Sequence, residues 1–464
     1  MSQDFEATLD VPVSRETLFA YHDAAGALQR LLPPWEPLAI EHSDQSLRVG
    51  SEVRMRGSLL GLPLRYTARH TQYEPPRLFQ DVQAEGPFGF WRHDHRFEEN
   101  GPNASRLIDH IEYGLPAGVV GRWAGAGLAE RKLQQMFRYR HRVTLDDLSM
   151  QANRPLRPLR IGVSGASGLV GTQLVAMLRM LGHTVDELVR GKAEQDGEIA
   201  VWDDAFAADA AGNLAKLRRL DAVIHLAGKP IADQRWTAAV KQQIRSSRVD
   251  KTRQLCQRLA ELGPDRPDVL LCASASGYYG DRGDQVLTET ASPGDGFLTE
   301  VAQQWEAACG PAGDAGIRVA QLRFGIVLSP QGGALQKTLL PARFGGGHLG
   351  GGKQWWSWIA LDDVLGGIYH ALVESQVQGP INFVSPQPVT NRQFTKTLAG
   401  VLNRPALVPA PAFALRMALG EMADSLLLAS VRAVPERLQE TGYTFRFADL
   451  QSALRHLLGR WPQD

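Results

Sequence analysis

The sequence contains little cysteine. Its 464 residues include only Cys256, Cys272 and Cys309, and no two of them form a Cys-x-x-Cys pair. Disulfide-stabilised secreted domains contain more cysteines, and cysteine-based zinc sites use closely spaced pairs. We therefore expect reduced, mostly buried thiols, a cytoplasmic protein and no cysteine-bound metal.

An excess of one charge and long apolar runs are also absent. The 50 Lys and Arg residues balance 50 Asp and Glu residues, which argues against a dedicated binder of nucleic acid or another polyanion. No uncharged apolar run approaches the roughly 20 residues that cross a bilayer. The opening MSQDFEATLD has neither the basic nor the apolar region of a secretory signal. We expect a soluble protein with no nucleic-acid partner and no membrane span.

The length predicts two or three domains, and residues 1–150 differ from the rest. A strand pattern is followed by a helix whose N-cap is Ser14, then by a series of short strands separated by Gly, Pro and Asn turns. A closing helix is predicted over 126–148. This pattern indicates an antiparallel α+β domain with strands at 5–11, 52–57, 64–73, 78–84, 90–98 and 105–113.

This order of elements resembles the helix-grip fold of the START/polyketide-cyclase superfamily. The resemblance implies an apolar cavity between sheet and helix, and hence an apolar ligand. Four aromatic residues would line the cavity or, alternatively, fill an ordinary core: Trp35, Phe88, Phe90 and Trp91.

Two histidines, His93 and His95, share one face of the strand predicted at 90–98. A metal site needs further ligands, and the sequence points to no third one. We therefore favour a polar strand face and expect no metal.

Residues 151–158 are polar, contain two prolines and indicate a linker. Residues 159–190 then read as strand, glycine-rich turn, apolar helix and second strand. Such a βαβ unit binds a dinucleotide, because glycine lets the backbone approach the pyrophosphate and the helix N-terminus offers free N–H groups. The expected cofactor-binding turn is Gly165, Ala166, Ser167, Gly168, Leu169, Val170 and Gly171.

The end of the second strand indicates which cofactor binds. NAD sites usually place an acidic residue there, whereas NADP sites offer an arginine to the 2′-phosphate. The strand ends at Val189-Arg190, and Asp186 comes too early to reach the ribose. Arg190 therefore favours NADP(H), although a solvated arginine is the alternative.

Strands and helices continue to alternate, which predicts a parallel Rossmann sheet over 159–403 and a small helical domain over 404–464. Strands are predicted at 198–202, 222–226 and 269–272, with a strand or pair of strands over 319–328. Ligands bind beyond the carboxyl ends of such strands. There the sequence places a second group of cofactor-binding candidates, Leu226, Ala227 and Gly228.

Several motifs agree in order and spacing with a known family. The glycine turn, HLAG, SASGYYG and QWWSWIALDDV resemble the extended branch of the short-chain dehydrogenase/reductase superfamily. More narrowly, residues 159–458 resemble its atypical "epimerase family" subgroup, which has a helical C-terminal domain. The resemblance implies a nicotinamide cofactor and an oxidoreductase or epimerase-like reaction on an unknown small molecule.

The catalytic pair of that superfamily is missing. Phe297 and Val301 stand where it has an acid/base tyrosine and, four residues later, a lysine; Ala275 replaces its serine. Two interpretations stay open. Other residues perform altered catalysis, or the domain is a non-catalytic NADP(H)-binding sensor or scaffold. Under the first interpretation, the candidate catalytic residues are Tyr278, Tyr279, Ser274 and Ser276.

Overall fold

The computed structural model describes residues 2–59, 62–116 and 118–462. Its internal contacts divide the chain into two compact units. The first consists of residues 1–157 with 175–183 and the stretch from Trp461 on; the second consists of 158–174 with 184–460.

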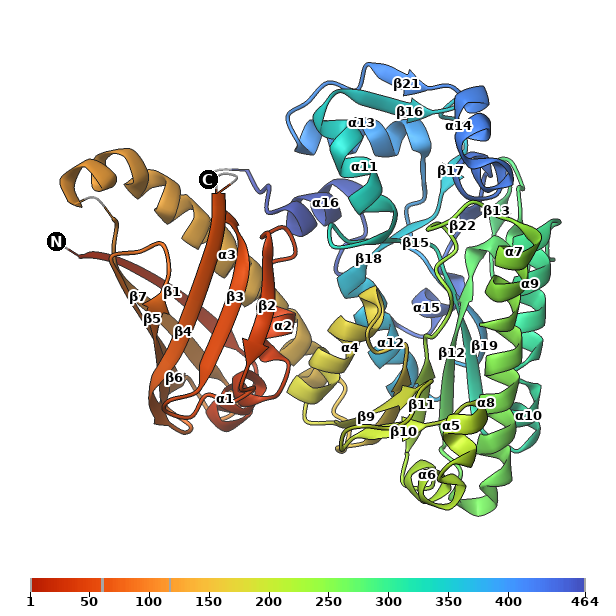
Figure 1. Ribbon diagram of the computed structural model, residues 1–464, viewed down its shortest axis with the longest axis horizontal. Helices are drawn as coiled ribbons and strands as arrows, with labels where there is room; N and C mark the ends of the chain where they lie inside the picture. Colours follow the sequence, from red (N-terminus) through yellow and green to blue (C-terminus); the bar gives the residue numbers. More distant parts are fainter. Residues whose placement is uncertain (1, 60–61, 117, 463–464) are drawn as a thin grey trace. The chain divides into compact units, whose positions relative to one another are not determined.

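The first unit contains a seven-stranded antiparallel sheet in the order β1-β7-β6-β5-β4-β3-β2 (Figure 1). Side chains along its first strand alternate between exposed and partly buried, as expected when one face of a sheet is solvated. Every strand expected from the sequence forms, and Leu38–Ser43 is an additional edge strand. The strands are β1 (Gln3–Val11), β2 (Leu38–Ser43), β3 (Glu52–Leu59), β4 (Leu62–Glu74), β5 (Leu78–Glu85), β6 (Phe90–Glu99) and β7 (Ser105–Gly114).

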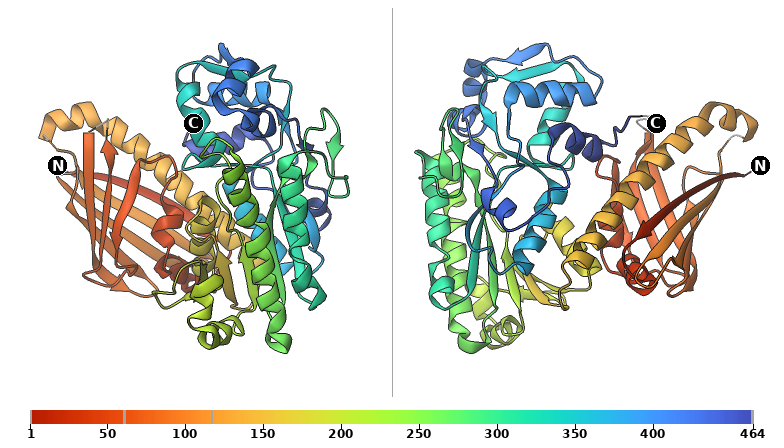
Figure 2. Two further views of the ribbon diagram at one scale, coloured as in Figure 1. Left: turned by 45° about the vertical axis from the view of Figure 1, so that its right-hand side comes forward. Right: turned by 180° about the vertical axis from the view of Figure 1, so that it is seen from behind.

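Three helices accompany this sheet: α1 (Arg15–Asp23), α2 (Ala27–Leu31) and the long α3 (Gly118–Asn153). Ser14 caps α1 as predicted, because its hydroxyl accepts a hydrogen bond from the Thr17 amide. Figure 2 shows α3 lying along the sheet. It reaches Asn153, so the first three residues of the expected linker are helical.

The aromatic residues expected around a cavity do not meet at one place. Phe88 and Trp91 pack against each other, with ring centroids 4.8 Å apart, in a cluster that includes Phe137 of α3. Trp35 packs edge-on against Tyr139, and Phe90 is exposed. Trp91 and Phe88 therefore belong to the apolar core between sheet and helix.

The second unit contains a parallel sheet of seven strands in the order β10-β9-β8-β11-β12-β14-β19, with helices on both faces (Figures 1 and 2). The predicted Rossmann-like α/β fold is confirmed. The sequence missed only the last of these strands, a five-residue segment. The strands are β8 (Arg160–Ser164), β9 (Thr184–Val189), β10 (Glu198–Ala200), β11 (Ala222–His225), β12 (Val269–Ala275), β14 (Arg318–Phe324) and β19 (Gly379–Phe383).

The helices that position the site are α4 (Leu169–Met180), α8 (Val249–Glu261) and α9 (Phe297–Ala307). The predicted strand pair over 319–328 is β14 followed by β15 (Ile326–Leu328). Helical segments dominate the C-terminal region, as expected: α14 (Ala412–Leu419), α15 (Glu436–Glu440) and α16 (Leu450–Leu458).

The glycine-rich stretch 345–352 includes a short strand. This strand, β16 (Gly346–Leu349), pairs with β21 (Val408–Ala410), and the Leu349 amide donates to Asn391. The stretch is therefore held in a small sheet.

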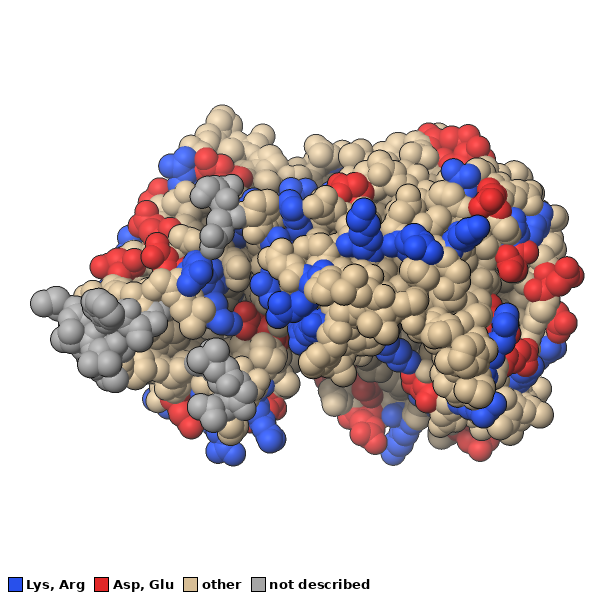
Figure 3. All heavy atoms as spheres, turned by 90° about the horizontal axis from the view of Figure 1, so that it is seen from above, with Lys and Arg blue, Asp and Glu red and all other residues tan. Residues whose placement is uncertain are grey.

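The surface carries charges of both signs. Figure 3 shows basic and acidic side chains mixed at the right-hand end of the face that it draws. Within the described parts of the chain, no helix is both long and apolar enough to cross a membrane.

Candidate functional site

The glycine turn after β8 lets other backbone segments pack closely against it. Gly165 has a left-handed φ of +72°, and a Cβ there would come within 2.9 Å of the Ala227 amide nitrogen. A Cβ on Gly171, in the first turn of α4, would overlap the Gly165 carbonyl oxygen. A side chain at Gly165 or Gly171 would therefore collide with backbone and open the turn.

The strand order places this turn at a topological switch point. From β8 the chain proceeds to β9 and β10 on one side, and then returns to β11 on the other side. Ligands of such sheets bind in the crevice at the carboxyl ends of the two central strands. Ser164 and His225 end β8 and β11 side by side. The structure thus brings the turn Gly165–Gly171 together with Leu226, Ala227 and Gly228.

Buried polar contacts fix the two strand ends. Ser164 Oγ lies 2.6 Å from His225 Nδ1, and it also accepts from the Ala227 amide at 3.3 Å. His225 Nε2 lies 2.9 Å from the Thr252 hydroxyl, to which the Trp305 indole donates at 3.0 Å. Burial lowers the pKa of His225 to about 4, so the imidazole is neutral at physiological pH.

β9 and the residue after it carry the two side chains on which the cofactor prediction depends, Asp186 and Arg190. Both carboxylate oxygens of Asp186 accept from the Arg160 guanidinium, at 2.5 and 2.8 Å, and Asp186 is buried. Arg190 follows β9 and is exposed. Arg190, and not Asp186, is thus the charged side chain available near the strand end.

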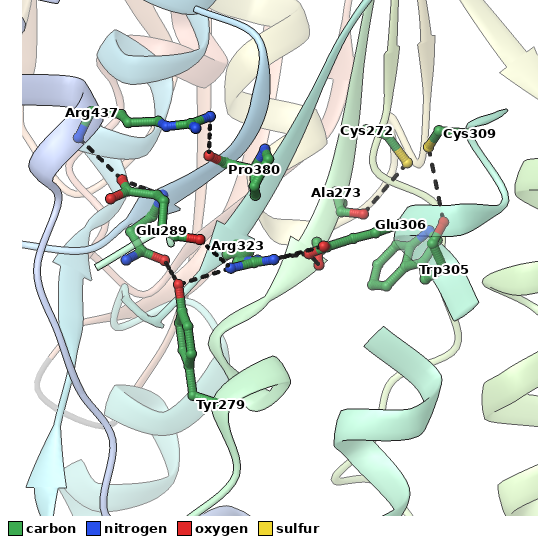
Figure 4. Close-up of polar contacts among 12 residues, drawn as sticks. Cys272, Ala273, Tyr279, Glu289, Trp305, Glu306, Cys309, Arg323, Pro380 and Arg437 are labelled. Atoms are coloured by element: carbon green, nitrogen blue, oxygen red, sulfur yellow. Dashed lines mark hydrogen bonds and ion pairs between the residues drawn. The ribbon is translucent and has the colours of Figure 1, made fainter. Parts of the chain in front are cut away.

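Three of the four catalytic candidates contact Arg323, a buried residue of β14, or its partner Glu306. Figure 4 shows Arg323 between Tyr279 and Glu306. The Arg323 guanidinium donates to both oxygens of Glu306, at 2.8 Å each, and to the Tyr279 hydroxyl at 3.0 Å. The same guanidinium lies 3.5 Å from the Tyr278 ring centroid. Arg323 therefore joins α9 to the loop that follows β12.

Tyr279 and Ser274 are committed to this interior network. The Tyr279 hydroxyl lies 2.7 Å from Asn382 Oδ1 and 3.1 Å from the Thr288 carbonyl, and Tyr279 is fully buried. Burial raises the pKa of Tyr279, whereas a catalytic lysine would lower it. Ser274 donates to Glu306 at 2.7 Å and is also buried.

Tyr278 and Ser276 differ from these two residues. Both belong to a single 3₁₀ turn, Ser276–Tyr279, and both are partly exposed. Of the four catalytic candidates, they are the two with surface available to a bound molecule.

The positions of the missing catalytic pair are packed with apolar groups. The Phe297 ring meets Trp236 edge-on at 5.2 Å, and Lys241 Nζ lies 5.1 Å from the Phe297 centroid. Val301 is buried. No proton-transfer group therefore stands at either position.

A further basic side chain, Arg248, lies close to Gly228. It is partly buried, its guanidinium lies 5.1 Å from the Trp305 ring centroid, and a Cβ on Gly228 would come within 3.2 Å of it. Burial lowers its pKa to about 10, so it stays charged near the carboxyl end of β11. Its closeness to Gly228 depends on tertiary packing and leaves no local sequence pattern.

Family models match two parts of the chain. Residues 161–383 match the NAD dependent epimerase/dehydratase family, and residues 410–457 match a domain of unknown function, DUF1731. An epimerase family protein of Mycobacterium bovis, Mb2239, is 38% identical over 301 residues, which cover 65% of this chain and 98% of that protein. YfhF of Bacillus subtilis is 37% identical over 302 residues, with the same coverage.

Two solved structures are also similar. A nucleoside-diphosphate sugar epimerase from Corynebacterium glutamicum has a TM-score of 0.77 and 33% identity, and the match covers 98% of this chain and 90% of that one. Human SDR39U1 with NADPH has a TM-score of 0.60 and 31% identity, covering 65% of this chain and all of that one.

Proposed function

The chain belongs to the epimerase family, and on that premise we propose that its Rossmann domain binds NADP(H) in preference to NAD(H) and acts on a small molecule in an oxidoreductase or epimerase-like reaction. The observation that carries the cofactor proposal is the glycine cradle at the switch point, where Cβ atoms on Gly165 and Gly171 would occupy the backbone's own space. A backbone packed this closely lets a pyrophosphate approach the N-terminus of α4.

The preference for NADP(H) depends on Arg190. Asp186 is engaged by Arg160 and buried, so it offers no carboxylate to the ribose hydroxyls. The exposed guanidinium of Arg190 can pair with a 2′-phosphate. The similar human protein, SDR39U1, has a structure with NADPH, which is in keeping with this choice.

A bound nicotinamide would supply or accept a hydride, and the protein must then position the substrate and move a proton. Tyr278 and Ser276 are the candidates for these roles, since they are partly exposed. Tyr279 and Ser274 would hold the loop in place through Arg323 and Glu306.

A second candidate function is binding without turnover, as a sensor or scaffold. The observation that favours it is the apolar packing of Phe297 and Val301 in place of the proton-transfer pair. Turnover separates the two functions: NADPH oxidation with a panel of carbonyl compounds supports the enzyme, and tight NADPH binding without turnover of any compound supports the sensor.

The cofactor proposal is tested by calorimetric titration of the full chain with NADPH and NADH. Arg190→Ala should weaken NADPH binding roughly 10- to 100-fold, the value of one charge-assisted phosphate contact, and leave NADH binding unchanged. Arg218→Ala is a matched control, because this exposed arginine precedes β11. It therefore lies toward the amino-terminal ends of the strands, away from the carboxyl ends that carry the candidate cofactor site. Equal affinities for the two cofactors in the unaltered protein would contradict the proposal.

For the first unit we propose a helix-grip domain of the START type that binds an apolar ligand. Its support is the order of elements, a curved antiparallel sheet closed by α3. A shift of its thermal transition by long-chain lipids, quinones or aromatic polyketides would support the proposal, and no shift with any of them would oppose it.

We further propose a cytoplasmic location, since Cys256, Cys272 and Cys309 are free and buried.

A further inference from the structure

The interior of the first unit contains a cluster of histidine and aspartate side chains. The strand register brings them together: Asp81 of β5 lies opposite His93 of β6, and His95 of β6 lies opposite Asp109 of β7. Opposite residues of an antiparallel pair share a face, as do residues two apart on one strand. All four side chains therefore share one face, and His141 of α3 reaches the same cluster, with Nε2 2.7 Å from Asp109.

The cluster is buried. The side chains of His93 and His95 are each 5% exposed, and that of Asp109 is 3% exposed. Trp91 and Phe137 border His93, with ring centroids 6.3 and 5.5 Å from its ring. Charged groups are kept in such surroundings only when they are paired or coordinate a metal.

Three atoms of the cluster face one another at distances of an ion pair, longer than a hydrogen bond. Asp81 Oδ2 is 3.6 Å from His93 Nδ1 and 3.7 Å from His95 Nε2, and the three ligand atoms all lie within 4.8 Å of one another. These separations exceed the range of a hydrogen bond. Ligand atoms bound tetrahedrally at about 2.0–2.1 Å from a metal lie about 3.4 Å apart, close to the observed spacing.

The opposite edges of both imidazole rings meet a second carboxylate. Asp109 Oδ1 lies 3.2 Å from His93 Nε2 and 2.7 Å from His95 Nδ1, while its Oδ2 contacts His141. Metal-binding histidines usually donate their other N–H to a carboxylate, which fixes the tautomer and the orientation of the ring. Asp109 thus lies on the side of both rings that is opposite Asp81, with a hydrogen bond to His93 and an ion-pair contact with His95.

We propose that Asp81, His93 and His95 bind one divalent transition-metal ion, with Asp109 as the carboxylate that orients both histidines. Two imidazoles and one carboxylate with an open coordination position are a donor set for Zn²⁺ and also for Fe²⁺. The tetrahedral spacing makes Zn²⁺ the first ion to test. The expectation of a plain polar strand face depended on the lack of a third ligand, and β5 supplies that ligand. This site is separate from the glycine turn, so its test does not depend on the proposed cofactor.

The experiment uses the full chain stripped with a chelator and then titrated with Zn²⁺ in a calorimeter, with Fe²⁺ under anaerobic conditions as a second arm. Replacement by Co²⁺ provides a visible absorption spectrum that reports the coordination geometry. We expect one equivalent of bound metal and a tetrahedral Co²⁺ spectrum. Asp81→Asn and His95→Gln should weaken binding at least 100-fold, and Asp109→Asn roughly 10- to 100-fold.

His42→Gln is the matched control, because His42 is an exposed histidine of the same unit that contacts Asp44; its replacement should leave metal binding unchanged. Circular dichroism of each stripped variant establishes that it is folded. If His95→Gln fails to fold, the Asp81→Asn variant tests the proposal alone. Its Co²⁺ spectrum should then differ from the tetrahedral spectrum of the unaltered chain. No bound metal in the folded, unaltered chain would overturn the proposal, as would unchanged binding in the folded Asp81→Asn variant.

Discussion

Ser164 Oγ lies 2.6 Å from His225 Nδ1, and this contact joins the ends of β8 and β11 directly beneath the glycine turn. The imidazole is fully buried between two hydroxyls, those of Ser164 and Thr252. Burial is the cause of its lowered pKa. The two strand ends that carry the candidate cofactor site are therefore held together by a histidine that stays neutral.

The first prediction concerns pH. The folded pKa of His225 is about 4, and the unfolded value is about 6.5. Above pH 6.5 neither state is protonated; below it the unfolded chain binds a proton that the folded chain does not. His225 should therefore reduce the free energy of unfolding progressively as pH falls from about 6.5 to about 4, by about 3 kcal/mol in all.

His225→Gln keeps a side chain able to bond both hydroxyls but removes the titration. Urea unfolding at a series of pH values should show a weaker loss of stability toward acid than in the unaltered chain. His42→Gln, at an exposed position, should leave the pH dependence unchanged. An identical slope for His225→Gln and the unaltered chain would contradict the prediction.

The second prediction concerns the glycine turn. Gly171→Ala should displace the turn, since its Cβ would overlap the Gly165 carbonyl oxygen. We expect at least a 10-fold loss of NADPH affinity in a calorimetric titration. Gly191→Ala is the control, because no atom lies within 4 Å of a Cβ built there. Equal affinities of the two variants would show that the turn does not form the pyrophosphate site.

The third prediction separates two adjacent tyrosines. Tyr279→Phe removes the hydroxyl that accepts from Arg323 and that donates to the buried Asn382 Oδ1, so it should lower the free energy of unfolding by about 1–3 kcal/mol. Tyr278→Phe keeps the ring that lies under Arg323 and should leave stability nearly unchanged. Once a substrate is found, Tyr278→Phe should reduce kcat. The reverse pattern, a stable Tyr279→Phe that loses turnover, would assign the chemistry to Tyr279.

The parts predicted well from the sequence are those coded locally. The β8–turn–α4–β9 unit, residues 160–189, lies in one continuous stretch, and its glycine spacing indicates its geometry. The choice of Arg190 over Asp186 stays a prediction, and it needed only the positions of the two residues along one strand. Patterns of this kind can be recognised in the sequence because they do not depend on contacts between distant segments.

The parts that were missed depend on register and long-range contact. Arg323 and Glu306 lie on different elements, and nothing in LRFG shows that its arginine is buried against a glutamate of α9. Asp81 lies opposite His93 only because β5 and β6 pair in one particular register. A shift by one residue would place Asp81 on the other face of the sheet, so the sequence alone did not show a third ligand.

The last prediction concerns a buried ion pair in the first unit. Arg30 donates to both oxygens of Asp147, at 2.9 and 3.0 Å, with both side chains almost fully buried, and the Tyr21 hydroxyl donates to Asp147 at 3.0 Å. Asp147→Asn would remove the carboxylate to which the buried Arg30 guanidinium donates twice, and it should cost about 3–5 kcal/mol of unfolding free energy. Urea unfolding of the full chain, followed by near-ultraviolet circular dichroism, measures the loss.

A double variant shows whether that cost arises from the charge that Arg30 keeps when the Asp147 carboxylate is lost. Arg30→Met combined with Asp147→Asn removes both charges and keeps an amide oxygen that accepts from Tyr21, so it should recover at least half of the loss. Arg106 and Asp10 form a pair of similar bidentate geometry, at 2.7 and 3.0 Å, but both side chains are exposed. Arg106→Met should therefore cost much less than Asp147→Asn, because water screens that pair. If Asp147→Asn cost no more than Arg106→Met, the interior around Arg30 would have to be accessible to water, and the attribution of stability to this ion pair would be wrong.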